Sequence, residues 1–280
     1  MNENTYFIDV RDERELARLQ VQDALFNEII EMLPASFMPG PRARILDLAC
    51  GPGGWPLQVS QVYPDVSVIG IDSSPQMIKY ARAQAEARGV STQFRIMNIL
   101  KPWHFPDSYI DFVNARFITG LVPISSLDSL LEECWRVLCP GGTVRFTETV
   151  FLSSPLSPTS QKLAAISYQA MHRAGLCFSP YEMTTGTIIA RMLRARGFER
   201  ISFTPYVIDL SYGAPLHRPM LENLVQGEKL LESFIKQMQI ASPEEIEALV
   251  QDFIRDWEDP NFCANYYVCS LSAVRPFEHE

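Results

Sequence analysis

Between residues 43 and 150, short apolar runs alternate with stretches of helical periodicity, and a glycine-rich turn follows the first run. We predict strands over 44–49, 66–72, 93–97, 110–115 and 143–149. Strands separated by helices pair in parallel through right-handed crossovers and build a sheet that is covered on both faces. This alternation therefore predicts an α/β fold, in which ligands bind at the carboxyl ends of the strands.

The rest of the chain is mainly helical. A helix over 12–33 precedes the first strand, and Pro34 ends it. Further helices are expected at 161–173, 185–196, 219–240 and from Ser242 onward, and further strands at 198–210 and 265–274. We expect a Rossmann-like, mostly parallel sheet of seven strands with the last strand antiparallel. Residues 1–42 would form a helical lid, and 43–280 one domain with helical insertions at about 151–197 and 215–260.

Composition excludes several classes of protein. The net charge of −9, from 33 acidic and 24 basic side chains, argues against binding of nucleic acid phosphates through a broad positively charged surface. The six cysteines form no C-x-x-C pair and there are only four histidines, so neither a disulfide frame nor a metal site is expected. No apolar run approaches the ~20 residues of a membrane span. We expect a cytoplasmic protein without nucleic-acid or membrane partners. The sequence leaves open whether the protein forms a homodimer.

The glycine-rich turn carries the clearest chemical signal. Gly51 and Gly53 lie between a strand and a helix, where small residues let the backbone approach a ligand and the helix offers free N–H groups. Asp72 ends the second strand, a position suited to binding ribose hydroxyls. A dinucleotide-binding turn would need a third glycine where this chain has Pro56. Asp47, just before the turn, suits an ammonium group better than a pyrophosphate.

Three segments together resemble a known family. Residues 46–53 resemble the first motif of the class I S-adenosylmethionine-dependent methyltransferases, 68–77 their second motif, and 136–142 the turn before their fifth strand. The resemblance covers about residues 43–150. The chain has Ala49 where the family usually has glycine, and Asn98 where an acidic residue is frequent.

The resemblance implies a binding site for S-adenosylmethionine. By position, it assigns Asp47, Ala49, Gly51 and Gly53 to the methionine moiety, Asp72, Ser73 and Met77 to the ribose and its surroundings, Asn98 and Ile99 to the adenine, Ala115 and Arg116 to the sulfonium, and Tyr6 and Gln22 to the lid.

Three residues are candidates for a catalytic role. Arg116 ends the fourth strand and either anchors a substrate carboxylate or pairs with a neighbour. Glu148, near the end of the fifth strand, is either a base or part of a structural ion pair, and His104 is either a base or a solvated loop residue. Methyl transfer needs alignment, exclusion of water and removal of a proton if the nucleophile carries one. A strong base is therefore not required.

The predicted function is methyl transfer from S-adenosylmethionine to a small, largely apolar organic acceptor, with S-adenosylhomocysteine as product. An enclosed pocket is expected from the aromatic and methionine residues that follow the fifth strand, Tyr168, Met171, Phe178, Tyr181 and Met183. Three alternatives stay open: a nucleic-acid or protein methyltransferase, a related fold that catalyses a non-methylating reaction, and a non-catalytic nucleoside-binding scaffold. The methylated atom is left open too.

Overall fold

A computed structural model describes residues 13–154, 157–183 and 185–277. Its centre is a seven-stranded sheet in the order β3-β2-β1-β4-β5-β7-β6. The strands are β1 (Arg44–Leu48), β2 (Ser67–Asp72), β3 (Gln93–Ile96), β4 (Ile110–Arg116), β5 (Leu138–Ser153), β6 (Glu199–Asp209) and β7 (Asn265–Val274). Strands β1 to β5 pair in parallel, and β7 runs antiparallel to both β5 and β6. The predicted α/β fold and the antiparallel last strand are confirmed.

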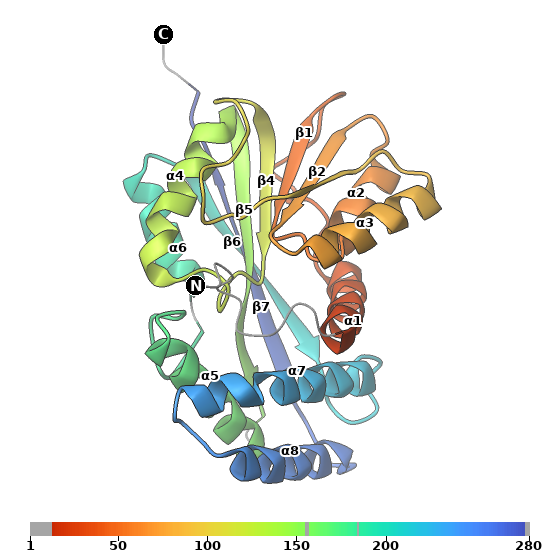
Figure 1. The fold of residues 1–280 in the computed structure, drawn as a ribbon, viewed down its shortest axis with the longest axis vertical. Coiled ribbons are helices and arrows are strands. Elements are labelled where there is room, and N and C mark those ends of the chain that lie inside the picture. The colour runs from red at the N-terminus through yellow and green to blue at the C-terminus, as the bar shows by residue number, and fades with distance from the viewer. Residues whose placement is uncertain (1–12, 155–156, 184, 278–280) are drawn as a thin grey trace.

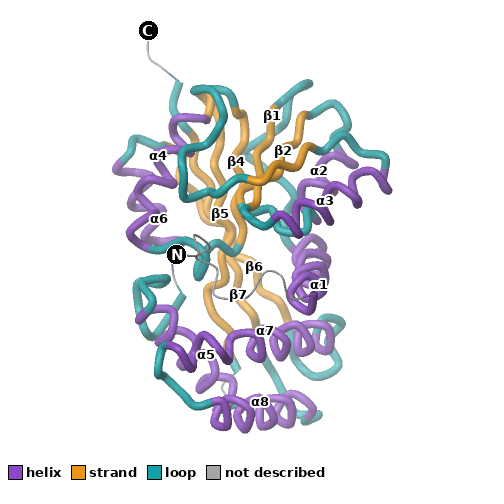
Figure 2. Tube along the Cα trace, viewed as in Figure 1, coloured by secondary structure: helices purple, strands orange, loops and turns teal. Residues whose placement is uncertain are grey.

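Helices cover both faces of the sheet (Figures 1 and 2). They are α1 (Glu13–Ile29), α2 (Gly54–Val62), α3 (Pro75–Arg88), α4 (Leu127–Val137), α5 (Pro158–Arg173), α6 (Thr185–Ala195), α7 (His217–Gln237) and α8 (Pro243–Glu258), with a short 3₁₀ turn at Ile124–Ser126. None of these helices in the described ranges is long and apolar enough to cross a membrane.

The side chains of each strand alternate between two apolar cores, one on each face of the sheet. On one face Ile45 and Phe112 pack with Trp55 and Val59 of α2. On the other, the apolar strand residues pack with α4 and α6, as Leu131 and Leu193 do. Successive side chains of a strand point to opposite faces, so strands buried on both sides are apolar at nearly every position. This explains the continuous apolar runs in the sequence.

A second apolar core lies beyond the carboxyl ends of the strands. Helices α5, α7 and α8 contribute most of it, and α1 adds Leu25, Phe26 and Ile30. These helices lie below the sheet in Figure 1, next to α1. Helix α8 begins as predicted, because Ser242 and Glu245 form a reciprocal capping box behind Pro243. Helix α5, which follows β5, and helices α7 and α8, between β6 and β7, thus build a separate layer at the carboxyl ends of the parallel strands.

A buried polar row crosses the face of the sheet that carries α2. Asp47, Asn114 and Arg145 are in register on β1, β4 and β5. Asn114 donates from Nδ2 to Asp47 at 2.6 Å and accepts from Arg145 Nε at 2.9 Å. The two terminal nitrogens of Arg145 donate to the carbonyl oxygens of Glu31 and Met32 at 2.7 and 2.9 Å. Arg145 thereby holds the segment after α1 against the sheet.

The first helix ends earlier than predicted. The apolar spacing predicts a helix to Leu33, but α1 ends at Ile29. The carbonyl oxygen of Met32 accepts hydrogen bonds from both Trp55 and Arg145, and Leu33 packs against the buried cluster that contains Trp55. The apolar residues after Ile29 are therefore buried by a turn that these two side chains stabilise, and they do not continue the helical stripe.

Replacing Arg145 with methionine tests the polar row. The Arg145→Met variant leaves the Glu31 carbonyl and the Asn114 oxygen without their Arg145 donors and removes one of the two donors to the Met32 carbonyl. We expect it to lower the free energy of unfolding by about 3 kcal/mol. Urea denaturation measures this loss. Arg191→Met, at an exposed site on α6, is the matched control and should change stability by less than about 0.5 kcal/mol. Equal stabilities for the two variants would contradict this role.

Candidate functional site

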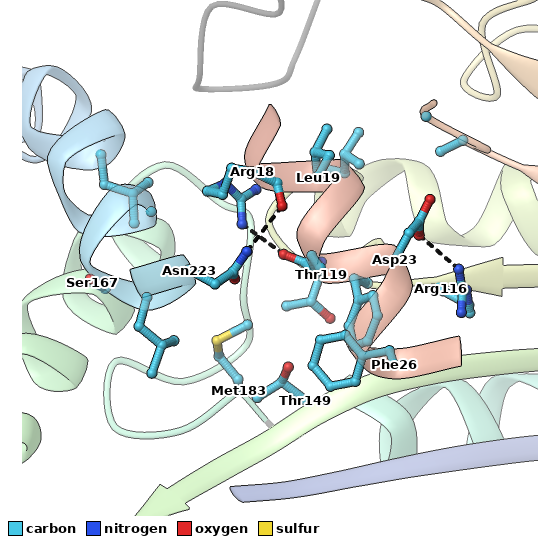
Figure 3. A pocket seen from close by; sticks show the side chains of 18 of the residues that line it. Arg18, Leu19, Asp23, Phe26, Arg116, Thr119, Thr149, Ser167, Met183 and Asn223 are labelled. Carbon is cyan, nitrogen blue, oxygen red and sulfur yellow. Dashed lines mark hydrogen bonds and ion pairs between the residues drawn. The ribbon is translucent and has the colours of Figure 1, made fainter. Parts of the chain in front are cut away.

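A cavity of about 370 Å³ lies where the strand ends meet the helical layer. That size is within the range of small-molecule sites. Its wall combines the ends of β1, β2 and β4, the inner side of α1, and residues of α5 and α7. Figure 3 shows Arg116 and Asp23 at one end of this cavity and Ser167 at the other, with Phe26, Thr149 and Met183 between them.

Most of the predicted cofactor residues line this one cavity. Those on its wall are Gln22, Asp47, Ala49, Gly51, Asp72, Ser73, Met77, Asn98, Ile99 and Arg116. Gly53 and Ala115 are not on the wall. Gly53 is the N-cap residue of α2, and Ala115 is fully buried in the sheet. Tyr6 lies outside the described residues.

Backbone conformation explains the glycine-rich turn. Gly51 has φ +52° and no atom lies within 4 Å of where its Cβ would be, so the backbone faces open space in the cavity. Gly53 has φ +85°, and a Cβ there would come within 2.7 Å of the Phe94 ring. Ala49 also has a left-handed backbone, with φ +51°. Such a conformation costs a non-glycine residue about 1 kcal/mol, which is a physical reason for glycine at this position.

Asp72 connects the ends of the first two strands. One carboxylate oxygen accepts from the backbone N–H of Gly51 at 2.9 Å and the other from Ser74 at 2.8 Å. Burial raises the pKa of Asp72, and the backbone N–H groups of Ser74 and Gly51 oppose that rise. Each carboxylate oxygen keeps a second lone pair. Asp72 can therefore hold the turn and accept hydrogen bonds from a ligand at the same time.

Asp47 is the buried acid beneath the turn. Burial raises its pKa to about 7, opposed by the charge of Arg116 and the hydrogen bond from Asn114. No cation pairs with it directly within the described ranges. A positively charged ligand group near Asp47 would therefore give this carboxylate a charge partner that the protein itself does not supply.

Arg116 pairs with the first helix. Its terminal nitrogens donate to Asp23 at 2.9 Å and to Asn27 at 2.7 Å, both on α1. Asp23 also accepts from the N–H of Gly54, the first residue of α2, at 3.1 Å. A Cβ on Gly54 would come within 2.5 Å of that carboxylate. Of the two predicted roles of Arg116, the structure shows pairing with a neighbour, and this pairing holds α1 over the strand ends.

Two further cofactor candidates already have polar partners. The side-chain oxygen of Asn98 accepts from the N–H of Leu100 at 2.8 Å and keeps a second lone pair. Gln22 accepts from Arg18 at 2.6 Å on the same helix.

Two catalytic candidates do not line the cavity. Both carboxylate oxygens of Glu148 accept from the backbone, from Ile118 at 2.9 Å and Thr119 at 3.3 Å. Burial raises the pKa of Glu148 to about 7, although those hydrogen bonds oppose the rise. Glu148 thus orders the loop after β4. His104 is an exposed loop residue. The structure does not bring either side chain to the other site residues.

Several wall residues are absent from the sequence prediction. Among the residues expected to enclose the pocket, Tyr168, Met171 and Met183 line it, whereas Phe178 does not and Tyr181 is exposed. The additional polar wall residues are Arg18, Asp23, Thr119, Thr149, Ser160, Ser167, Asn223, Glu228 and Tyr266. They come from α1, α5, α7, the loop after β4 and the ends of β5 and β7. No local motif marks them. In the described ranges no group of three His, Cys, Asp or Glu residues could hold a metal ion.

Replacing Arg116 tests its hold on α1. The Arg116→Met variant leaves the largely buried Asp23 without its charged partner, and we expect the free energy of α1 opening to fall by about 3 kcal/mol. Native-state hydrogen exchange of the α1 amides measures this change. Arg44→Met, which removes a half-exposed pair with Asp111, should leave α1 protection unchanged. Unchanged protection in Arg116→Met would contradict the role of this ion pair.

Comparisons with known proteins agree with this geometry. Residues 45–142 match a family model described as a methyltransferase domain. A demethylmenaquinone methyltransferase of Thermus thermophilus is 39% identical over 99 residues, which cover 35% of this chain and 44% of that protein. The chain thus spans less than half of this relative's length.

Two solved structures share the fold. Phosphoethanolamine N-methyltransferase 2 of Haemonchus contortus, in complex with phosphomonomethylethanolamine and S-adenosylhomocysteine, has a TM-score of 0.58 at 18% identity and covers 96% of this chain and 60% of its own. The [4+2]-cyclase SpnF has a TM-score of 0.54 at 22% identity and covers 92% and 82%. The chain thus matches a methyltransferase domain over residues 45–142 and has the fold of S-adenosylmethionine-dependent methyltransferases.

Proposed function

We propose that this protein transfers a methyl group from S-adenosylmethionine to a small, largely apolar organic acceptor. One observation carries the proposal: the glycine-rich turn and Asp72 border the same cavity as the apolar residues of α5 and α7. A polar end that suits a nucleoside is therefore continuous with an apolar chamber that suits the acceptor.

The residues on the polar end fit S-adenosylmethionine, which supplies an electrophilic methyl group on a sulfonium. Asp72 would accept hydrogen bonds from the ribose hydroxyls, and Asp47 would face the ammonium. The open space at Gly51 leaves room for the methionine moiety. Ser73, Met77, Asn98 and Ile99 would border the ribose and adenine. The chain itself contributes binding, orientation and exclusion of water.

Helix α1 would close this site. It carries five wall residues, Arg18, Leu19, Gln22, Asp23 and Phe26. It joins the rest of the protein through Arg116 and through the bond from Asn223 of α7 to the Arg18 carbonyl at 3.0 Å. We propose residues 1–42 as the lid, with 151–197 and 215–260 as insertions that shape the acceptor chamber. We also propose a cytoplasmic location, consistent with the free cysteines of the described chain.

The alternatives make different predictions. The likeness to a cyclase keeps a non-methylating reaction as a second candidate. Such a protein would bind S-adenosylmethionine without consuming it, whereas a scaffold would bind it and change no small molecule. A nucleic-acid methyltransferase would need a basic groove, which the net charge of −9 disfavours. Release of S-adenosylhomocysteine in the presence of an acceptor distinguishes methyl transfer from a non-methylating reaction and from a scaffold.

Asp72→Ala tests the ribose assignment. Loss of hydrogen bonds to a charged group should weaken S-adenosylhomocysteine binding by about 1.5–3 kcal/mol, as measured by isothermal titration calorimetry. Asp65→Ala, at an exposed site before β2, is the matched control and should bind normally. Unchanged affinity in Asp72→Ala would refute the assignment, and absence of binding to the wild-type protein would refute the proposed function.

Affinity for S-adenosylhomocysteine should depend on pH through Asp47. With its pKa raised to about 7, Asp47 is mostly neutral in the ligand-free protein at pH 6 and mostly ionised at pH 7.5. The ammonium binds the ionised form, so affinity should rise about eightfold over this interval. Calorimetry at several pH values measures the rise. Asp47→Asn should remove it, and a flat wild-type profile would show that Asp47 does not face the ammonium.

A further inference from the structure

The cavity has a second polar end, which the proposed cofactor site does not use. Glu228 of α7 and Ser167 of α5 both line the cavity, and the Ser167 hydroxyl donates to Oε2 of Glu228 at 3.3 Å. In Figure 3, Ser167 lies at the end of the cavity opposite Arg116, with the apolar side chains of Phe26 and Met183 between them. Glu228 is therefore separated from the strand ends, where the methyl donor would lie, by the apolar part of the chamber.

Two oxygens at this end of the cavity are open to a ligand. Oε1 of Glu228 and the hydroxyl of Tyr168 have no hydrogen-bond partner among the described residues, and protein atoms do not enclose them, so they border the cavity that both residues line. Burial raises the pKa of Tyr168 to about 12, and the charges of Tyr266 and Glu228 add to the rise, so the two open oxygens belong to one group of side chains.

No cation of the described chain balances the charge of Glu228. The arginines on the cavity wall are Arg18 and Arg116, and they pair with Glu15 and Asp23 of α1. Within the described ranges no lysine or histidine lines the cavity, and Glu228 forms no ion pair. Burial raises the pKa of Glu228 to about 7. An ionised Glu228 is therefore costly until a ligand brings a positive charge to it.

We propose that Glu228, Ser167 and Tyr168 form a subsite that binds an ammonium group of the acceptor, at the end of the acceptor remote from the atom that is methylated. This inference rests on the proposed function. It specifies an acceptor with two ends: a nucleophile that faces the methyl donor at the strand ends, and an amine that Glu228 binds. The apolar body of the acceptor connects the two. Glu228 is thus a specificity residue and takes no part in the chemical step.

An ammonium group matches the hydrogen-bonding capacity of this subsite. It carries three N–H donors and a positive charge, and the carboxylate and the hydroxyl oxygens of Ser167 and Tyr168 can all accept. A hydroxyl group would offer one donor and no charge. A carbonyl group would offer no donor, and the Ser167 proton is already directed to Glu228. Of these three groups, only the ammonium compensates the buried carboxylate.

Three probes with one apolar body test the chemistry of the subsite: 4-butylbenzylamine, 4-butylbenzyl alcohol and 4-butylacetophenone. The measurement is calorimetry at pH 8 with S-adenosylhomocysteine bound. The wild-type protein should bind the amine about tenfold or more tightly than the alcohol or the ketone, because hydrogen bonds between charged groups are stronger than neutral ones. Equal affinities for the three probes, or a preference for the alcohol or the ketone, would overturn the proposal.

A charge-removing variant tests whether Glu228 causes this preference. Glu228→Gln keeps the size of the side chain and an acceptor for Ser167 but has no charge, so its affinities for the amine and the alcohol should agree within about threefold. Glu222→Gln, at an exposed site on the same helix, should keep the wild-type preference. A preference for the amine that persists in Glu228→Gln would mean that another acid binds the ammonium.

A crystal structure with S-adenosylhomocysteine and 4-butylbenzylamine tests the position of the amine. Its nitrogen should lie within hydrogen-bond distance of Glu228, and the butyl chain should extend along the cavity towards the strand ends. A nitrogen beside the sulfur of S-adenosylhomocysteine would identify the amine as the group that is methylated, and it would overturn the remote subsite.

The two proposals fail in different ways. Both variants should bind S-adenosylhomocysteine with wild-type affinity, because Glu228 and Glu222 lie away from the strand ends. If the wild-type protein does not bind S-adenosylhomocysteine, the proposed function is wrong and this inference falls with it. If it binds S-adenosylhomocysteine but the preference for the amine is absent or does not depend on Glu228, only the inference is wrong.

Discussion

Two buried arginines attach the first helix to the sheet, and the functional cavity depends on them. Arg116 of β4 binds Asp23 and Asn27 within α1, and Arg145 of β5 binds the carbonyls of Glu31 and Met32 just after it. Without these contacts α1 would keep its apolar packing against α7 and the lower core and the hydrogen bonds from Asn223 and Gly54. The arginines therefore help to decide where α1 lies, and α1 forms one wall of the cavity.

The same contacts bring acidic groups to the ligand end of the sheet. Asp23 joins Arg116 to the N-terminus of α2, and Asn114 joins Arg145 to Asp47. Burial raises the pKa of both acids, so their ionised forms are costly in the empty protein. A cationic ligand offsets part of that cost at Asp47. The energetic cost of an ionised, buried Asp47 thus favours binding of a positively charged group.

Sequence reasoning selected residues that mostly lie on the wall of one cavity, because their determinants are local. Ala49, Gly51, Asp72 and Asn98 each lie at or just beyond the carboxyl end of a strand, and parallel strands bring these ends to one edge. Glu148 and His104 were weaker predictions, since position near a strand end does not say where a side chain points. Glu148 turns towards the backbone of the loop after β4, and His104 towards solvent. The length of α1 was also overestimated, because Arg145 and Trp55 bind the carbonyl of Met32 beyond its end.

The sequence by itself determined the α/β fold, the strand directions and the residues around the turn, because these follow from periodicity and from the backbone needs of a few positions. Only the tertiary structure decided that Arg116 pairs with Asp23, that α1, α5 and α7 share one cavity, and that Glu228 points into it beside Ser167. The physical reason is distance along the chain. Ser167 and Glu228 are separated by 61 positions, and Arg116 and Asp23 by 93, so no local pattern encodes their contact.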